Sequence, residues 1–297
     1  MPIIADVTAS SGPTLDELVT EITSAARGFS IAPDKWITLA GDMAEGALTF
    51  TVIGEASAGV KEIGDELVLV TAVDQESGTC TVHPRGRGWE GSVATAHLEG
   101  DVVLEGPALP RSRCAKMVND AIAHLHPVLF GVGSVTEVTT GYRVELPAEA
   151  EHVLEVRELH DGEWHRARHY EAEMSSEHGT TGRAVRLPST CIGTEVKVVY
   201  AARPEPFATV DQQWSDTGLS VGAKDVVVLD VLARFAQVLD IGRLTDRFVS
   251  PKGDPQQPQL GAGFGMARQL RADYETALAR EALALRTLYP ARSHFVR

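Results

Sequence analysis

Residues 224–242 read KDVVVLDVLARFAQVLDIG, and this stretch decides the predicted fold. Apolar residues fill nearly every position, and the interior polar residues Asp230, Arg234 and Gln237 are spaced by four and three, which places them on one helical stripe. A helix that is apolar around most of its circumference is buried on several sides. Gly242 is the predicted end of the helix, because glycine readily takes the left-handed conformation that closes one. We expect a central helix that packs against its own chain and against a neighbouring copy through four positions: Val228, Leu232, Phe235 and Leu239.

Three other segments carry a helical pattern, at residues 14–27, 110–126 and 265–289. The first opens with a capping box, in which the hydroxyl of Thr14 and the carboxylate of Glu17 satisfy amides at the helix start. Between the helices the apolar period changes to two and glycines separate short runs, which indicates two antiparallel β-regions, the first a barrel or a sandwich.

The predicted fold class is therefore α+β, a helical bundle with two inserted antiparallel β-domains. Six segments follow from it: an N-terminal bundle helix, a small β-domain, a bundle helix, a second β-domain, the central and last bundle helices, and a C-terminal tail. Their bounds are 1–30, 31–106, 107–132, 133–206, 207–290 and 291–297.

Composition restricts the possible functions. The chain has 297 residues and a formal net charge of −14, which argues against a surface that grips nucleic acid, because phosphate contacts need clustered Lys and Arg. Its three cysteines are far apart and show no metal-ligand spacing, which favours a reducing compartment. The sequence shows neither a signal peptide nor an apolar run long enough to cross a membrane.

No residue pattern points to a catalytic, cofactor or metal site. His160 and His165 flank the predicted hairpin turn Asp161-Gly162, but they lack the spacing of known zinc motifs and are expected to be solvated. Residues 86–91 fit Gly-x-Gly-x-x-Gly without a helix after them, which favours a tight turn over a phosphate loop. We expect a protein that is not an enzyme and carries no cofactor.

Two stretches resemble a known family. Residues 67–74 and 79–103 contain a strand, an Arg-Gly turn, Gly-Ser, small residues and then His97-x-x-Gly-x-x-Val, a cassette found in virion proteins of tailed phages. Residues 285–297, LRTLYPARSHFVR, resemble the end of head-to-tail adaptor (connector) proteins of phages that infect actinobacteria. The order of elements also matches, so the resemblance covers nearly the whole chain; Cys80 and Ser92 depart from it in detail.

The resemblance implies a bundle of connector-adaptor type and a virion protein of the head–tail neck, assembled in the host cytoplasm. Its partners would be further copies of itself in a ring, usually a dodecamer, the portal protein, and a stopper or tail-terminator protein. Double-stranded DNA would pass through the ring without specific binding, and no membrane is involved. Arg85 and His97 would fix the cassette loop, and the portal-docking residues would be Tyr289, Arg292, Phe295 and Arg297.

Two other classes of function stay open. A tail or baseplate protein whose β-domains bind host glycan would need exposed aromatic side chains clustered on one face, whereas the four tryptophans are scattered along the sequence. An enzyme such as a cell-wall hydrolase would need a metal site or a pair of carboxylates.

Overall fold

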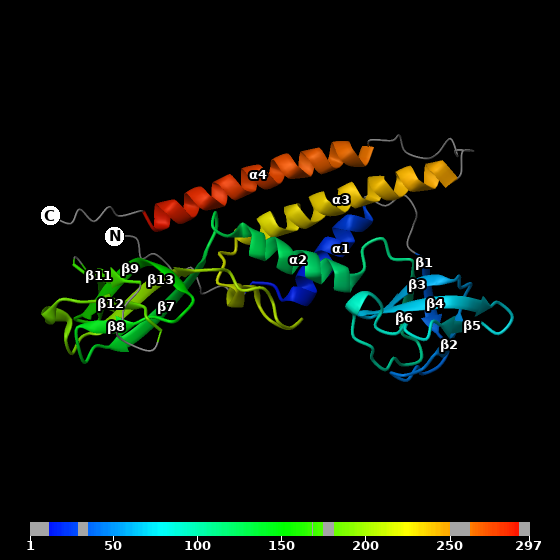
Figure 1. Cartoon of the computed structure of the whole chain (residues 1–297), viewed down its shortest axis with the longest axis horizontal. Coiled ribbons are helices and arrows are strands. Elements are labelled where there is room, and N and C mark those ends of the chain that lie inside the picture. Colours follow the sequence, from blue (N-terminus) through cyan, green and yellow to red (C-terminus); the bar gives the residue numbers. More distant parts are fainter. Residues whose placement is uncertain (1–11, 29–34, 168, 175–180, 250–261, 291–297) are drawn as a thin grey trace. The chain divides into compact units, whose positions relative to one another are not determined.

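The computed structural model describes residues 12–28, 35–167, 169–174, 181–249 and 262–290 (Figure 1). Within them the chain forms two compact units, both discontinuous in sequence. Unit 1 comprises residues 12–15, Asn119–Leu229 and 272–290, and unit 2 comprises Asp16–Val118 and Asp230–Arg271. The four helices of the described residues are α1 (Leu15–Arg27), α2 (Arg111–Leu125), α3 (Ala223–Val249) and α4 (Ala262–Leu288).

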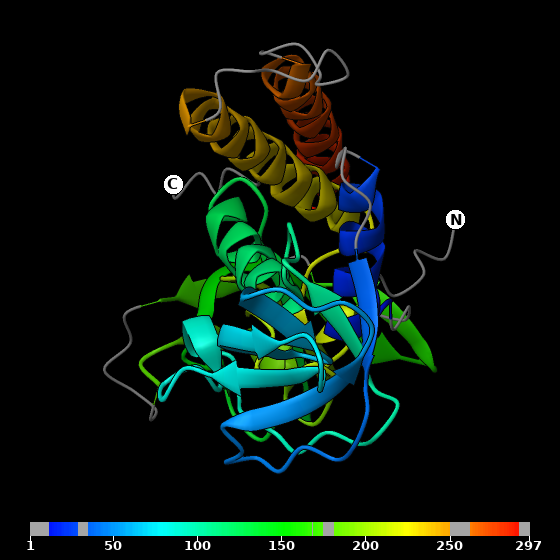
Figure 2. The same cartoon turned by 90° about the vertical axis from the view of Figure 1, so that its right-hand side faces the viewer.

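Unit 2 is built around a closed β-barrel with the strand order β1-β2-β5-β4-β3-β6, all neighbours antiparallel (Figure 2, blue and cyan strands). Its strands are β1 (Lys35–Leu39), β2 (Thr49–Ile53), β3 (Gly59–Ile63), β4 (Glu66–Asp74), β5 (Thr79–Val82) and β6 (Val102–Glu105). Inward side chains such as Leu39, Phe50 and Val103 fill the barrel core. The barrel is one of the two architectures that the sequence allowed.

The β4–β5 hairpin shows how local sequence sets this topology. Asp74 accepts hydrogen bonds from the Ser77 hydroxyl (2.7 Å) and the Glu76 amide (3.1 Å), which closes the turn. Gly78 then takes a positive φ of 68°, and a Cβ at this position would lie 2.5 Å from the carbonyl oxygen of Val52. The turn therefore needs glycine at this position.

Unit 1 contains two antiparallel sheets, a four-stranded one in the order β10-β9-β13-β7 and a three-stranded one in the order β11-β12-β8. Their strands are β7 (Gly131–Val138), β8 (Arg143–Glu145), β9 (Ala150–His160), β10 (Glu163–Arg166), β11 (Glu171–Glu173), β12 (Ala184–Arg186) and β13 (Glu195–Ala202). One core cluster joins side chains of both sheets, among them Val144, Val156, Val185 and Val198. The predicted hairpin turn Asp161-Gly162 is confirmed, since His160 pairs with Glu163 across it and both turn residues have positive φ.

The predicted fold class, a helical bundle with two inserted β-domains, is wrong. The chain is mixed α/β with about equal helix and strand content, including the closed six-stranded barrel. Both compact units combine strands with helical segments, and in the described residues the most extensive contacts between elements are strand pairs. An apolar helical stripe indicates that a helix is covered, but it does not reveal whether a helix or a sheet covers it.

Gly242 does not end the central helix, because α3 continues to Val249. Glycine inside a helix costs about 1 kcal/mol relative to alanine, which neighbouring residues can offset. Residues 243–249 read RLTDRFV and contain neither proline nor glycine, and the next proline is Pro251, so the sequence lets the helix continue to Val249.

Candidate functional site

The cassette that carries the family resemblance is organised by one buried carboxylate. Glu66, the first residue of β4, is 1% exposed. Its Oε1 accepts from Arg87 Nε (2.6 Å) and the Gly88 amide (3.1 Å), and its Oε2 accepts from Arg87 Nη2 (2.9 Å) and the Thr95 amide (3.0 Å). His97 Nε2 lies 2.8 Å from the same Oε2. We call Glu66, Arg87 and His97 the barrel clamp.

Electrostatics keep the clamp ionised. Burial alone would raise the pKa of Glu66, but hydrogen bonds from Arg87, the Thr95 amide, His97 and the Gly88 amide outweigh it and lower the pKa to about 2. A carboxylate that accepts several charge-assisted hydrogen bonds is held firmly as the anion. Glu66 is therefore an anion near neutral pH, and Arg87 balances its charge.

The clamp ties the 86–98 loop to the rest of the barrel. Arg87 also donates to the carbonyl oxygens of Ala44 (2.6 Å), Ala47 (3.2 Å) and Thr95 (2.5 Å). The main chains of Met43 and His97 exchange two hydrogen bonds of 2.8 Å. A guanidinium with five donors can bridge three separate backbone segments in this way.

The two residues assigned to loop fixing have different surroundings. His97 is 7% exposed and lies inside the clamp, whereas the side chain of Arg85 is exposed. The Arg85 amide donates to His83 Nδ1 over 3.1 Å, but the guanidinium that holds the loop belongs to Arg87. Sequence reasoning also missed Glu66. A usable signal was present, because a lone carboxylate opens an otherwise apolar strand and needs a cation once it is buried.

The residues expected to contact a neighbouring copy lie largely inside the single chain. Leu232 and Phe235 are buried and Val228 is half-buried, while the side chain of Leu239 lies outside the described residues. Most of the apolar surface between Ala223 and Ala236 is thus covered without a second copy. An excess of apolar residues in this part of α3 gives no independent reason for oligomerisation.

The polar stripe of α3 faces α4. Asp230 is 3% exposed and pairs with Arg234 one turn on and with Arg271 of α4, whose Nη1 lies 3.2 Å from its Oδ1. Within unit 2 this ion pair links the α3 segment that begins at Asp230 to the first part of α4 (Figure 1). Ion pairing of a buried aspartate therefore joins the two helices.

Large apolar side chains remain on the outside of these helices. The four most exposed in the described residues are Val238 on α3 and Phe264, Met266 and Leu283 on α4. Leu283 is 66% exposed, although most of the residues around it on α4 are polar or alanine. Single exposed apolar residues are common, but three of these four, Val238, Phe264 and Met266, belong to unit 2, where they leave apolar surface available for another protein.

Only one of the predicted portal-docking residues lies in the described part of the chain. Tyr289 is half-buried, and its amide donates to the carbonyl oxygen of Leu285 (2.8 Å), which continues the last turn of α4. The other three, Arg292, Phe295 and Arg297, lie outside the described residues.

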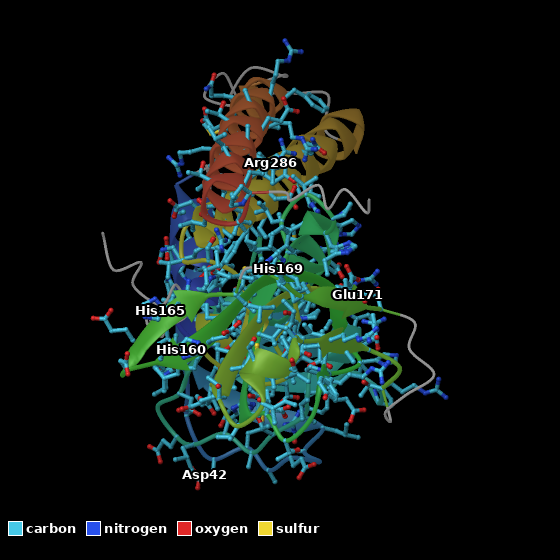
Figure 3. The ribbon with its side chains drawn as sticks, turned by 90° about the vertical axis from the view of Figure 1, so that its left-hand side faces the viewer. Asp42, His160, His165, His169, Glu171 and Arg286 are labelled. Atoms are coloured by element: carbon cyan, nitrogen blue, oxygen red, sulfur yellow. The ribbon has the colours of Figure 1, made fainter. Side chains whose placement is uncertain are left out.

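Two histidines of unit 1, His160 and His165, are brought near each other by the β9–β10 hairpin (Figure 3). The ring centroids of His160 and His165 are 6.2 Å apart, and His160 Nε2 lies 3.1 Å from Glu158 Oε2. Within residues 12–290, leaving aside those not described, no group of three or more His, Cys, Asp or Glu side chains is arranged to hold a metal ion.

None of the helices in the described ranges combines the length and the apolar character needed to cross a bilayer. No protein-family model matches the chain. No curated protein matches its sequence significantly. The account of function therefore depends on the residues themselves and on the resemblance described above.

Proposed function

We propose that this chain is a structural protein of the tailed-phage virion, a head-to-tail adaptor. In this proposal several copies close into a ring that joins the portal to the stopper or tail and lines the DNA channel in the neck of the particle. The protein supplies shape and contacts, and it catalyses no reaction. The proposal rests on the resemblance of the cassette and the chain end to adaptor proteins, together with the surface of α3 and α4.

The surface of the helix pair is the observation that carries the proposal. Val238, Phe264 and Met266 in unit 2 are each between 43% and 47% exposed, and Leu283 in unit 1 is more exposed still. Burying such a side chain in an interface contributes about 1.5–3 kcal/mol. Since one copy leaves four of them in water, association of several copies has a clear source of free energy.

The charge of the chain is consistent with a DNA conduit. With a formal net charge of −14, the assembled wall would repel the duplex phosphates over about 8–10 Å at physiological salt. Repulsion over that range keeps a moving duplex from adhering to the wall. A basic wall would bind the duplex, because contacts of Lys and Arg with the phosphates release the counterions condensed on the DNA.

The proposal assigns portal docking to the C-terminal segment. Residues 291–297 read ARSHFVR and combine an aromatic side chain with two arginines, the residue types that dominate binding energy in interfaces. This segment follows Tyr289 at the end of α4. The assignment covers Tyr289, Arg292, Phe295 and Arg297.

Co-assembly with the portal protein tests the proposal. Full-length chain and a form truncated after Pro290 are mixed with purified portal, and complexes are separated by size. We expect the full-length chain to join the portal and the truncated chain to remain separate with unchanged circular dichroism. A chain in which only Ser293 and His294 are replaced by alanine serves as the matched control and should still bind. Equal binding by the truncated form would refute the docking assignment, and no binding by the full-length chain would refute the proposed partner.

A further inference from the structure

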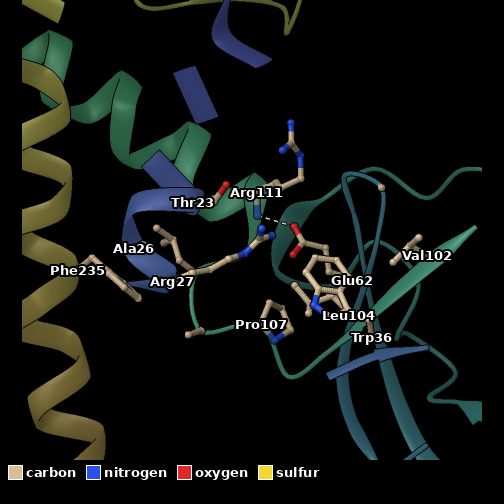
Figure 4. A pocket seen from close by; sticks show the side chains of 13 residues that line it. Thr23, Ala26, Arg27, Trp36, Glu62, Val102, Leu104, Pro107, Arg111 and Phe235 are labelled. Carbon is tan, nitrogen blue, oxygen red and sulfur yellow. Dashed lines mark hydrogen bonds between the residues drawn. The ribbon is translucent and has the colours of Figure 1, made fainter. Parts of the chain in front are cut away.

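Unit 2 contains a cavity of 260 Å³ beside the barrel (Figure 4). Ala26 of α1, Leu109 and Phe235 of α3 form part of its apolar lining. Trp36 of β1, itself 50% exposed, forms part of the wall that reaches solvent. Sites for drug-sized ligands measure roughly 300–1,000 Å³, so this smaller cavity suits a single side chain.

A buried carboxyl group points into the cavity. Glu62 of β3 is 5% exposed, and its Oε1 accepts from the amide of Arg111, the first residue of α2, at 2.5 Å (Figure 4). That hydrogen bond uses only Oε1. Among the described residues no fully buried side-chain oxygen lacks a partner, so Oε2 is open to the cavity, and a guest that covers it must donate to it.

The cations around Glu62 do not neutralise it. Arg111 directs its guanidinium to the carboxylates of Asp65 (2.9 Å) and Asp16, so those two aspartates balance its charge. Arg27 of α1 is exposed, and water screens charges at the surface far more than it screens charges in the interior. An incoming cation would therefore feel the attraction of Glu62 more strongly than the repulsion of Arg27.

The indole on the cavity wall already accommodates a guanidinium. Arg27 Cζ lies 4.9 Å from the centroid of the Trp36 ring, which is a cation–π contact. Methylene groups can pack on Val102, Leu104 and Pro107, which also line the cavity. Guanidinium stacks on aromatic faces better than ammonium does and donates two parallel hydrogen bonds to one carboxylate.

We propose that this cavity is a binding site for one arginine side chain of a partner protein, with the guanidinium at Glu62 Oε2 and the methylene stem against Trp36. Arginine fits better than a neutral apolar side chain, because an apolar guest would leave the acceptor oxygen of Glu62 buried and unsatisfied. The site is independent of the proposed ring and of the C-terminal segment.

The site binds a proton in competition with its guest. Burial is the main cause that raises the pKa of Glu62 to about 7, and the nearby charge of Asp65 raises it further. The hydrogen bond from the Arg111 amide and the charges of Arg111 and Arg27 act in the opposite direction and lower this pKa. An arginine guest favours the ionised form, so binding releases a proton and strengthens as pH rises through 7. A neutral guest of the same shape would show the opposite dependence or none.

The test uses the full chain and a small probe, N-acetyl-arginine amide, with N-acetyl-citrulline amide as the neutral isostere. Binding is followed by the NMR signal of the Trp36 indole N–H, identified by its loss in Trp36→Phe. We expect saturable shifts with the arginine probe, none with citrulline, and an affinity that rises between about pH 6 and about pH 8. Equal binding of the two probes, or an affinity that is the same at both pH values, would overturn the proposal.

Two variants complete the test. Glu62→Gln keeps an acceptor for the Arg111 amide but removes the charge, and we expect a loss of affinity of about tenfold or more. Glu45→Gln removes an exposed carboxylate of the same unit and should bind as the parent does. Unchanged binding by Glu62→Gln would contradict the proposal. Should that variant fail to fold, the pH dependence of the parent chain decides the outcome alone.

Discussion

Glu66 and Arg87 form a bidentate ion pair inside the barrel, with Nε–Oε1 at 2.6 Å and Nη2–Oε2 at 2.9 Å. Both side chains are nearly excluded from solvent, at 0% and 8% exposure. The pair fixes the turn that contains Arg87 against β4, and His97 closes the arrangement from the far end of the same loop. The shape of the loop thus depends on two side chains that are 21 residues apart.

Arg87→Gln should destabilise unit 2. The substitution leaves Glu66 buried without its main cation, and breaking a buried pair from one side costs about 3–5 kcal/mol. Unfolding in urea, followed by circular dichroism, measures this loss. We expect the variant to unfold at a lower urea concentration, with a similar dependence of the free energy of unfolding on urea.

Arg85→Gln is the matched control for that substitution. Its side chain is exposed, so the free energy of unfolding should change by no more than about 0.5 kcal/mol. A similar loss in both variants would show that the clamp contributes no more than an ordinary surface charge.

Glu62 should make unit 2 less stable in alkali. Burial raises the pKa of Glu62 from its ordinary value of 4.5 to about 7, so the folded state holds the proton more tightly than the unfolded state. The protonated carboxyl group contributes to the free energy of unfolding in full at pH values below the pKa of the unfolded state. This contribution, roughly 3 kcal/mol, is lost as the pH rises through the pKa of the folded state. Denaturation at a series of pH values between about 4 and 9 measures it. The decline should disappear in Glu62→Gln, and a decline that persists there would assign it to another group.

Gly78→Ala should cost more stability than Gly64→Ala. Both glycines have positive φ, 68° and 59°, so both alanines would be strained by about 1–2 kcal/mol. At Gly78 the new Cβ would also meet the Val52 carbonyl oxygen at 2.5 Å, whereas nothing lies within 4 Å at Gly64. Thermal unfolding gives the melting temperature of each variant. Equal melting temperatures would show that the β4–β5 turn shifts to accommodate the new Cβ without loss of stability.

Leu283→Ser should weaken ring assembly without unfolding the chain. Leu283 is 66% exposed, so its replacement should change the free energy of unfolding by no more than about 0.5 kcal/mol. Val93→Ser makes the same kind of change at a 75% exposed position of the barrel loop and is expected to leave assembly intact. Light scattering at matched protein concentrations measures the mass of the assemblies that the two variants form. Normal assembly by Leu283→Ser would show that this part of α4 is not in the interface.

Local patterns predicted the elements well. The 3.6 period placed α1 and α2 within one residue of their ends, and the Asp161-Gly162 signal placed the β9–β10 turn. The closure of the barrel could not be read in the same way. Strand β6 (Val102–Glu105) pairs with both β1 and β3, and these partners lie far from it in the sequence.

The sites depend on contacts that the sequence does not reveal. Arg85 and Arg87 lie in the same Arg-Gly repeat, and only the fold shows which one reaches Glu66. Glu62 lies in strand β3 beside Lys61 and accepts from a helix start 49 residues away. Long-range pairing of this kind follows from topology, which no local pattern encodes.

The mass of the full-length chain, alone and after mixing with portal protein, decides whether copies of the chain close into a ring. The proposed assembly is a closed ring of many copies that joins the portal as one particle. A single subunit, both when free and when bound in the virion, would contradict it.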